Sequence, residues 1–102
     1  MTNLTDRVQI DSLAMYPWLT TPEADRNSII KRLHELAKLG PDEWHEPEVR
    51  PIRHLPGVYL LEAQDDFRVV FRREDDGKLT IRDIMIQALI DLFTSKPVEA
   101  AS

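Results

Sequence analysis

The stretch FRVVFRREDDGKLTIRD, residues 67–83, carries the clearest strand and turn signals in this chain. Aromatic and β-branched residues dominate Phe67–Arg73, as is typical of a strand. Asp76-Gly77 is a strong signal for a hairpin turn, and Lys78–Ile86 can supply the returning strand. The sequence therefore predicts an antiparallel hairpin at the centre of the fold.

Four arginines lie within this hairpin, and arginine is rarely buried without a partner. Successive side chains of a strand point to opposite faces, so the aromatic positions of Phe67–Arg73 share one face, which we expect to be core. Arg68 and Arg72 then lie on the opposite face, about 13 Å apart at roughly 3.3 Å per residue. If the register keeps the hydrophobic sets together, Arg82 joins them. Such a surface suits phosphate or carboxylate groups.

A long amphipathic helix is predicted over residues 22–39, because apolar residues recur there at three- and four-residue spacing. Thr20 and Glu23 can form a capping box at its start. Gly40 suits a left-handed cap at its end. Pro17 is expected to end or kink a shorter helix before it, in which Trp18 is a core anchor.

The other elements that we expect are a short strand at 7–10, a solvated connector at 41–57, a strand at Val58–Ala63 and a helix over Ile86–Phe93. Together they predict an α+β fold, with a short N-terminal strand and helices packed on an antiparallel sheet of three to four strands, and with a C-terminal helix. We expect a single domain over residues 1–102, with its core at about 7–94 and frayed ends.

Composition excludes several classes of function. A net charge of −5 argues against broad affinity for nucleic acid. The absence of cysteine excludes disulfide and thiolate chemistry and fits a reducing cytoplasm. The N-terminus lacks a signal-peptide pattern, and no apolar run approaches the roughly 18 residues of a membrane span. The acids and histidines at 43–54 match no standard zinc motif, so we expect a cytoplasmic protein without a metal.

The helix IIKRLHELAK (29–38) followed by IRHLPGVYLLEAQDDFRVVFRREDDGKLTIRDI (52–84) resembles the RelE/ParE superfamily of type II toxin–antitoxin toxins. The resemblance covers about residues 13–93, and LPGVYLL and DFRVVFR are its most specific parts. It implies a cognate antitoxin protein as partner, and no metal or other cofactor. RelE-like members cut messenger RNA on the ribosome, whereas ParE-like members bind DNA gyrase.

The same resemblance suggests site residues, because cations offset the charge that develops on phosphate during cleavage. Arg68 matches the arginine of the aromatic-Arg motif, and Tyr59 matches the aromatic residue that opens the preceding strand. We therefore predict Arg68 and Arg82 as catalytic residues of a metal-independent endoribonuclease. The predicted phosphate contacts are Arg68, Arg72, Arg73 and Tyr59.

The sequence also departs from the family pattern at several positions. Leu60 and Glu62 stand where the family has lysines, and Phe93 lies near the position of its tyrosine. Three hypotheses stay open: a toxin that acts on ribosome and mRNA, a non-catalytic binder on the same fold (a gyrase inhibitor or a member that mainly binds an antitoxin), or arginines that only pair with Glu62, Asp66 or Glu74. A homodimer is also open.

Overall fold

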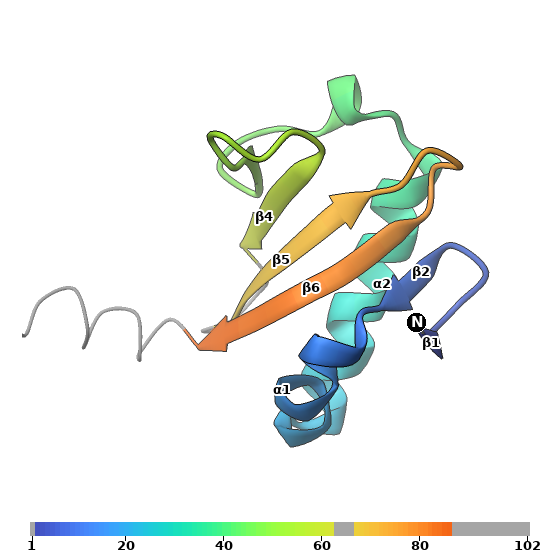
Figure 1. Cartoon of the computed structure of the whole chain (residues 1–102), viewed down its shortest axis with the longest axis vertical. Helices are drawn as coiled ribbons and strands as arrows, with labels where there is room; N and C mark the ends of the chain where they lie inside the picture. The colour runs from blue at the N-terminus through green and yellow to red at the C-terminus, as the bar shows by residue number, and fades with distance from the viewer. Residues whose placement is uncertain (1, 63–66, 87–102) are drawn as a thin grey trace, which may run out of the picture.

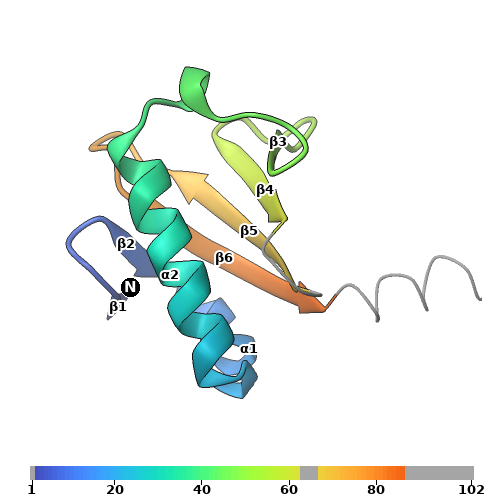
Figure 2. The same ribbon diagram turned by 180° about the vertical axis from the view of Figure 1, so that it is seen from behind.

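A six-stranded sheet with one long helix across one face forms the body of the molecule (Figures 1 and 2). This computed structural model describes residues 2–62 and 67–86. The strands are β1 Thr2–Asn3, β2 Val8–Ile10, β3 Val49–Pro51, β4 Val58–Glu62, β5 Phe67–Arg73 and β6 Leu79–Ile86. The helices are α1 Met15–Thr20 and α2 Glu23–Lys38, with 3-10 turns η1 Ser12–Ala14 and η2 Pro41–Glu43.

The strand order is β1-β2-β6-β5-β4-β3, and only the β2–β6 pair is parallel. The predicted α+β class is confirmed, but the sheet is mixed and six-stranded rather than antiparallel with three to four strands. β1 and β3 have two and three residues, too few for a detectable alternation. The predicted helix over Ile86–Phe93 lies, apart from Ile86 at the end of β6, outside the described residues.

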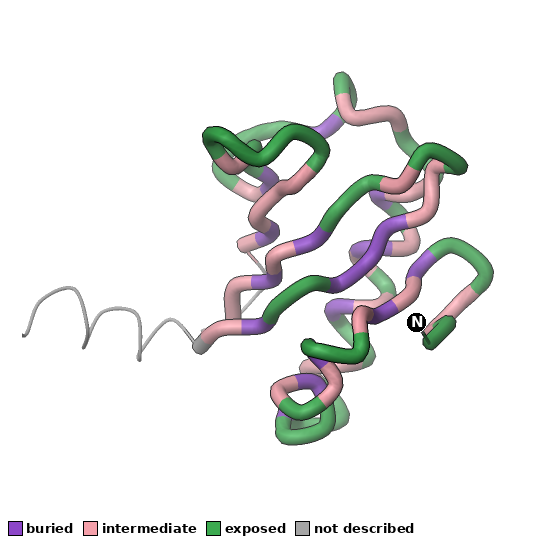
Figure 3. Tube along the Cα trace, viewed as in Figure 1, coloured by how far each residue is buried: buried purple, intermediate pink, exposed green. Residues whose placement is uncertain are grey.

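The core lies between α2 and the sheet face that α2 covers. Figure 3 shows buried segments along the central strands and along α2 behind them. The buried residues of α2 are Ile29, Leu33 and Leu36, which form its apolar stripe. Val69 and Phe71 are fully buried, so the predicted core face of β5 is confirmed. Burying a side chain of this size stabilises the fold by about 1.5–3 kcal/mol. Neither described helix has the length and apolar composition that crossing a membrane requires.

The start of α2 differs from the prediction. Thr20 belongs to α1, where its hydroxyl donates to the carbonyl oxygens of Tyr16 (3.2 Å) and Pro17 (3.0 Å), so it forms no capping box with Glu23. α2 instead begins after Pro22 without a side-chain cap. Pro17 lies within the first turn of α1, where its missing N–H needs no partner, so it does not end the helix.

The end of α2 is also closed in an unexpected way. Gly40 has a φ of −83°, so it is not a left-handed cap. The indole Nε1 of Trp44 instead donates to the carbonyl oxygen of Leu36 at 3.0 Å. The same carbonyl oxygen also accepts from the backbone N–H of Leu39 at 3.1 Å, so the buried bond from Trp44 mainly ties the connector to the end of α2.

Candidate functional site

The candidate site is the open face of the sheet, the face that α2 does not cover and that Figure 1 shows toward the viewer. The register places Glu62 of β4 opposite Arg68 of β5, and Arg68 opposite Met85 of β6. Leu60 of β4 stands opposite both Arg50 of β3 and Val70 of β5. The centre of the open face is therefore a mixture of apolar and charged side chains.

Glu62, the last residue of β4, places a carboxylate between two arginines of this face. Its Oε1 lies 3.8 Å from Nε of Arg68 and 3.7 Å from Nη2 of Arg50. Nη1 of Arg68 also donates to the carbonyl oxygen of Phe67 at 3.2 Å, and the Arg68 side chain is only 19% exposed. The arginine that best matches the family motif thus lies in a row with a second arginine, and one carboxylate stands between the two guanidinium groups.

Arg72 lies beside a polar network that crosses three strands. Its Nε is 3.9 Å from Oε1 of Glu74. The same Glu74 oxygen accepts from the hydroxyl of Thr80 at 2.9 Å, and the Thr80 hydroxyl accepts from Nε2 of Gln9 at 2.8 Å. Thr80 is fully buried, so its hydroxyl needs these partners.

Arg82 is separated from this row by an irregularity in β6. Phe71 pairs with Ile81 and Val70 with Asp83, which leaves Arg82 as an extra residue in a bulge. Its Nε lies 3.5 Å from Oδ2 of Asp11, which follows β2 on the other side of β6 from β5. The hairpin register keeps the hydrophobic sets together, with Phe71 opposite Ile81 and Val69 opposite Ile84, and the bulge at Arg82 makes this possible.

The two remaining predicted residues do not join Arg68. Tyr59 belongs to the core side of β4, where its ring stacks on Phe71 at 5.7 Å and meets Trp44 edge-on at 4.9 Å. Arg73 is exposed at the end of β5, opposite Leu79, and shares the strand parity of Phe71. The structure thus places Arg68 and Arg72 on the open face, Tyr59 on the other, and Arg82 beside Asp11.

The separations in these ion pairs have a chemical consequence. At 3.5–3.9 Å they exceed the roughly 2.7–2.9 Å of a charge-assisted hydrogen bond. The guanidinium groups therefore keep N–H donors for an incoming ligand, although nearby acids offset their charge. Within the described residues, no group of three or more His, Asp or Glu side chains could hold a metal ion.

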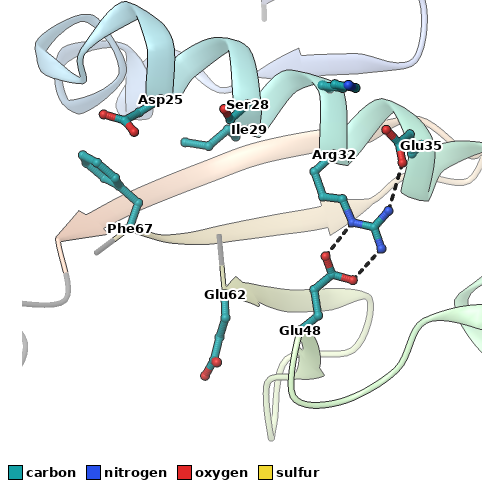
Figure 4. A pocket seen from close by; sticks show the side chains of 9 residues that line it. Asp25, Ser28, Ile29, Arg32, Glu35, Glu48, Glu62 and Phe67 are labelled. Atoms are coloured by element: carbon teal, nitrogen blue, oxygen red, sulfur yellow. Dashed lines mark hydrogen bonds and ion pairs between the residues drawn. The ribbon is translucent and has the colours of Figure 1, made fainter. Parts of the chain in front are cut away.

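A second charged cluster, which sequence reasoning missed, lines a pocket beside α2 (Figure 4). Arg32 donates from Nε and Nη2 to both carboxylate oxygens of Glu48, and from Nη1 to Glu35 at 3.0 Å. The hydrogen bonds from Arg32 hold the pKa of Glu48 below its usual value, and those to Glu48 raise the pKa of Arg32. The three-residue spacing of Arg32 and Glu35 is visible in the sequence, whereas the pairing with Glu48 is not.

Comparison with solved structures identifies the architecture. The isolated Escherichia coli RelE toxin matches with a TM-score of 0.64 at 16% identity, over 93% of this chain and 97% of that chain. The fold is that of the RelE toxins. A chain of the intact E. coli RelBE toxin-antitoxin complex matches with a TM-score of 0.60 at 18% identity, over 76% of this chain and 90% of that one.

An archaeal structure has the same RelE fold. A chain of the RelB-RelE antitoxin-toxin complex from Methanococcus jannaschii matches with a TM-score of 0.59 at 10% identity, over 83% of this chain and 96% of that chain. No protein-family model and no curated protein matches the sequence. The resemblance to the RelE/ParE superfamily that the sequence suggests is confirmed at the level of the fold.

Proposed function

We propose that the chain is the toxin component of a type II toxin–antitoxin pair, and that Arg68 contacts an RNA phosphate when the toxin acts on translation. The observation that carries this proposal is the RelE fold, which extends over 93% of the chain in the match to isolated RelE. Two of the similar structures are complexes of RelE with RelB, which supports an antitoxin as the partner of this chain.

Arg68 is the best candidate for the phosphate contact because of its position and chemistry. It lies on the open face of β5, a strand inside the sheet, and its planar guanidinium can donate two parallel N–H groups to a phosphate. A cation there would stabilise the negative charge that develops during cleavage. Arg72, on the same face of β5, is a further candidate for a phosphate contact, and Arg82 is a second catalytic candidate on β6.

One observation favours a second candidate, a toxin-fold protein that binds its target without cleaving RNA. Glu62 lies within 4 Å of both Arg50 and Arg68 and would repel a phosphate brought to either. Gyrase inhibition, or binding of an antitoxin alone, requires no cationic centre for cleavage and is compatible with this arrangement.

Induced expression in E. coli separates the two candidates. We expect the chain to arrest growth and to produce cleaved mRNA, visible by primer extension, and we expect Arg68→Ala to relieve the arrest and to reduce cleavage by about 100-fold or more, as loss of one charge-stabilising donor does. Tyr59→Phe is the matched control: it lies in the core cluster and should leave both readouts unchanged.

The other outcomes are equally specific. Arrest with intact mRNA and induction of the DNA-damage response would select the gyrase-type binder. Soluble protein that causes no arrest would contradict any toxin role, and full toxicity of Arg68→Ala would contradict the site.

A further inference from the structure

Three large apolar side chains lie exposed along one side of the first helical segment. Leu13 is 85% exposed, Tyr16 78% and Leu19 61%, and we call these three residues the α1 stripe. Ala14 and Trp18 of the same segment are buried in the core. η1 and α1 sit at the end of the molecule where α2 begins (Figures 1 and 3). The burial of Ala14 and Trp18 fixes the orientation of the helix, so the stripe cannot turn inward.

The α1 stripe is almost free of competing polar groups. α1 contains no acidic or basic residue. Thr20, on the same side, directs its hydroxyl back to the carbonyl oxygens of Tyr16 and Pro17. At the other end, Asp11 accepts from the N–H of Leu13 at 3.0 Å and pairs with Arg82. Single exposed apolar residues are common on protein surfaces, whereas a continuous apolar side of a helix marks an interaction surface.

The size of the stripe indicates the kind of partner. At roughly 150–250 Å² for a whole large side chain, the three residues expose on the order of 400 Å². A standard protein interface buries about 800 Å² on each partner. The stripe is therefore too small to form a stable interface by itself. Its small size suits a partner that adds a few apolar anchors at three- and four-residue spacing, as an amphipathic helix does.

The charge near the stripe favours a helix of another protein over a second copy of this chain as the occupant. Glu23, exposed in the first turn of α2, follows the stripe by four residues, and the whole chain carries a net charge of −5. A two-fold contact through the stripe would bring together two copies that each carry this net negative charge. A helix with lysine or arginine beside its apolar side would instead meet complementary charge.

We propose that the α1 stripe is the docking surface for an amphipathic helix of a partner protein, with basic residues flanking the apolar side of that helix. The inference rests on the proposed function only for the identity of the partner, which is then a segment of the antitoxin. The surface lies on η1 and α1, outside the strands of the sheet that carry Arg68.

The test uses two labelled 18-residue helical peptides with the same leucine side, one flanked by lysine and the other by glutamate. By fluorescence anisotropy on the full chain, we expect the lysine peptide to bind at least tenfold more tightly. Tyr16→Lys and Leu19→Lys should each weaken it by about tenfold or more, as loss of a central anchor does. Leu55→Lys, at a leucine that is 51% exposed outside α1, is the matched control and should bind normally.

Amide chemical-shift changes in the NMR spectrum should centre on residues 12–23. Equal binding of the two peptides, equal weakening by Leu55→Lys, or shift changes centred elsewhere would overturn the proposal. Sedimentation that shows self-association, lost in Leu19→Lys, would assign the stripe to a second copy. If the peptide binds only after residues 87–102 are removed, the occupant of the stripe would be that segment of the same chain, which would also overturn the proposal. Because none of these measurements uses growth arrest, a stripe that binds in a chain without toxicity would refute only the proposed function.

Discussion

Arg32 is the residue that holds two parts of the chain together at the edge of the pocket. It projects from α2 and donates to Glu35 of the same helix and to Glu48, which directly precedes β3. Bidentate pairs of this kind are stronger than single contacts, but both the Arg32 and Glu48 side chains are 39% exposed. Solvent screening therefore limits the contribution of the pair to roughly 1 kcal/mol or less.

Glu48→Gln should lower the free energy of unfolding by about 0.5–1 kcal/mol at pH 7. The pKa of Glu48 is depressed in the folded state relative to 4.5, so the stabilisation is present above that pH and is lost as pH falls through the lower, folded value. Urea denaturation at pH 7 and at successive pH values below 4.5 should show the difference between variant and parent shrinking toward zero. Glu43→Gln, an exposed position in η2, is the control and should match the parent throughout. A difference that grows at low pH would contradict this account.

Strand alternation was sufficient to place Arg68 and Arg72 opposite the core face, and Glu62 and Glu74 were predicted as acids that could pair with them. The pairing of Arg82 with Asp11 was out of reach, because it depends on a bulge in β6 and on the neighbouring β2. The position of Tyr59 could not be predicted either, since the face of β4 is set by its register with β5 and not by its own sequence.

Among the elements, the longer ones were predicted well, because their helical or strand periodicity repeats several times. α2 runs from Glu23 to Lys38, against an expectation of 22–39, and β5 has the bounds predicted. The capping of α2 was predicted wrongly. Thr20 lies inside α1, and at the other end the side chain of Trp44 donates to the carbonyl oxygen of Leu36. A hydrogen bond from a residue eight positions away follows no local sequence pattern, so it could not be predicted.

The β5–β6 hairpin gives a prediction about its glycine. Gly77 has a φ of 88°, and its N–H donates to the carbonyl oxygen of Glu74 at 2.9 Å. Gly77→Ala should destabilise the fold by about 1 kcal/mol, because alanine in the left-handed region is strained although space for its Cβ is open.

Gly40→Ala is the matched control for the hairpin. Gly40 has an ordinary φ of −83°, and the added Cβ would meet only the flexible end of Asp42, at 2.9 Å from Oδ1. Urea denaturation should show a loss for Gly40→Ala of no more than about half that for Gly77→Ala. Equal losses would mean that backbone strain is not the cause.

At the scale of the whole molecule, the sheet joins the two ends of the described chain. Val8 and Ile10 of β2 pair in parallel with Leu79 and Ile81 of β6, and all four are fully buried. Hydrophobic patterning predicts that each strand has a buried face but not which strands are neighbours, so the mixed sheet could not be derived from it. The fold was predicted from the resemblance of the sequence to the RelE/ParE superfamily, because such a resemblance implies the topology of the whole family.

The charge balance of the open face can be changed as a unit. Glu62→Lys would turn the row Arg50, Glu62 and Arg68 into three cations, because Glu62 is the acid between the two arginines. We expect affinity for a 20-nucleotide single-stranded RNA to rise by about tenfold or more at low salt, and the dependence of log affinity on log salt to steepen by about 0.7 for each phosphate newly contacted. Filter binding across a range of salt concentrations measures both.

Glu43→Lys is the control for this change, since it alters the net charge by the same amount in η2, outside the open face. If net charge alone governs RNA affinity, the two variants will gain equally and share one salt slope, and the open face has no special role. If the row is the binding surface, only Glu62→Lys gains, and Arg68→Ala in that background should remove most of the gain. The parent chain, in which Glu62 offsets Arg50 and Arg68, should then bind RNA weakly with a shallow salt slope, because few phosphates can be neutralised on a face whose cations already have acidic neighbours.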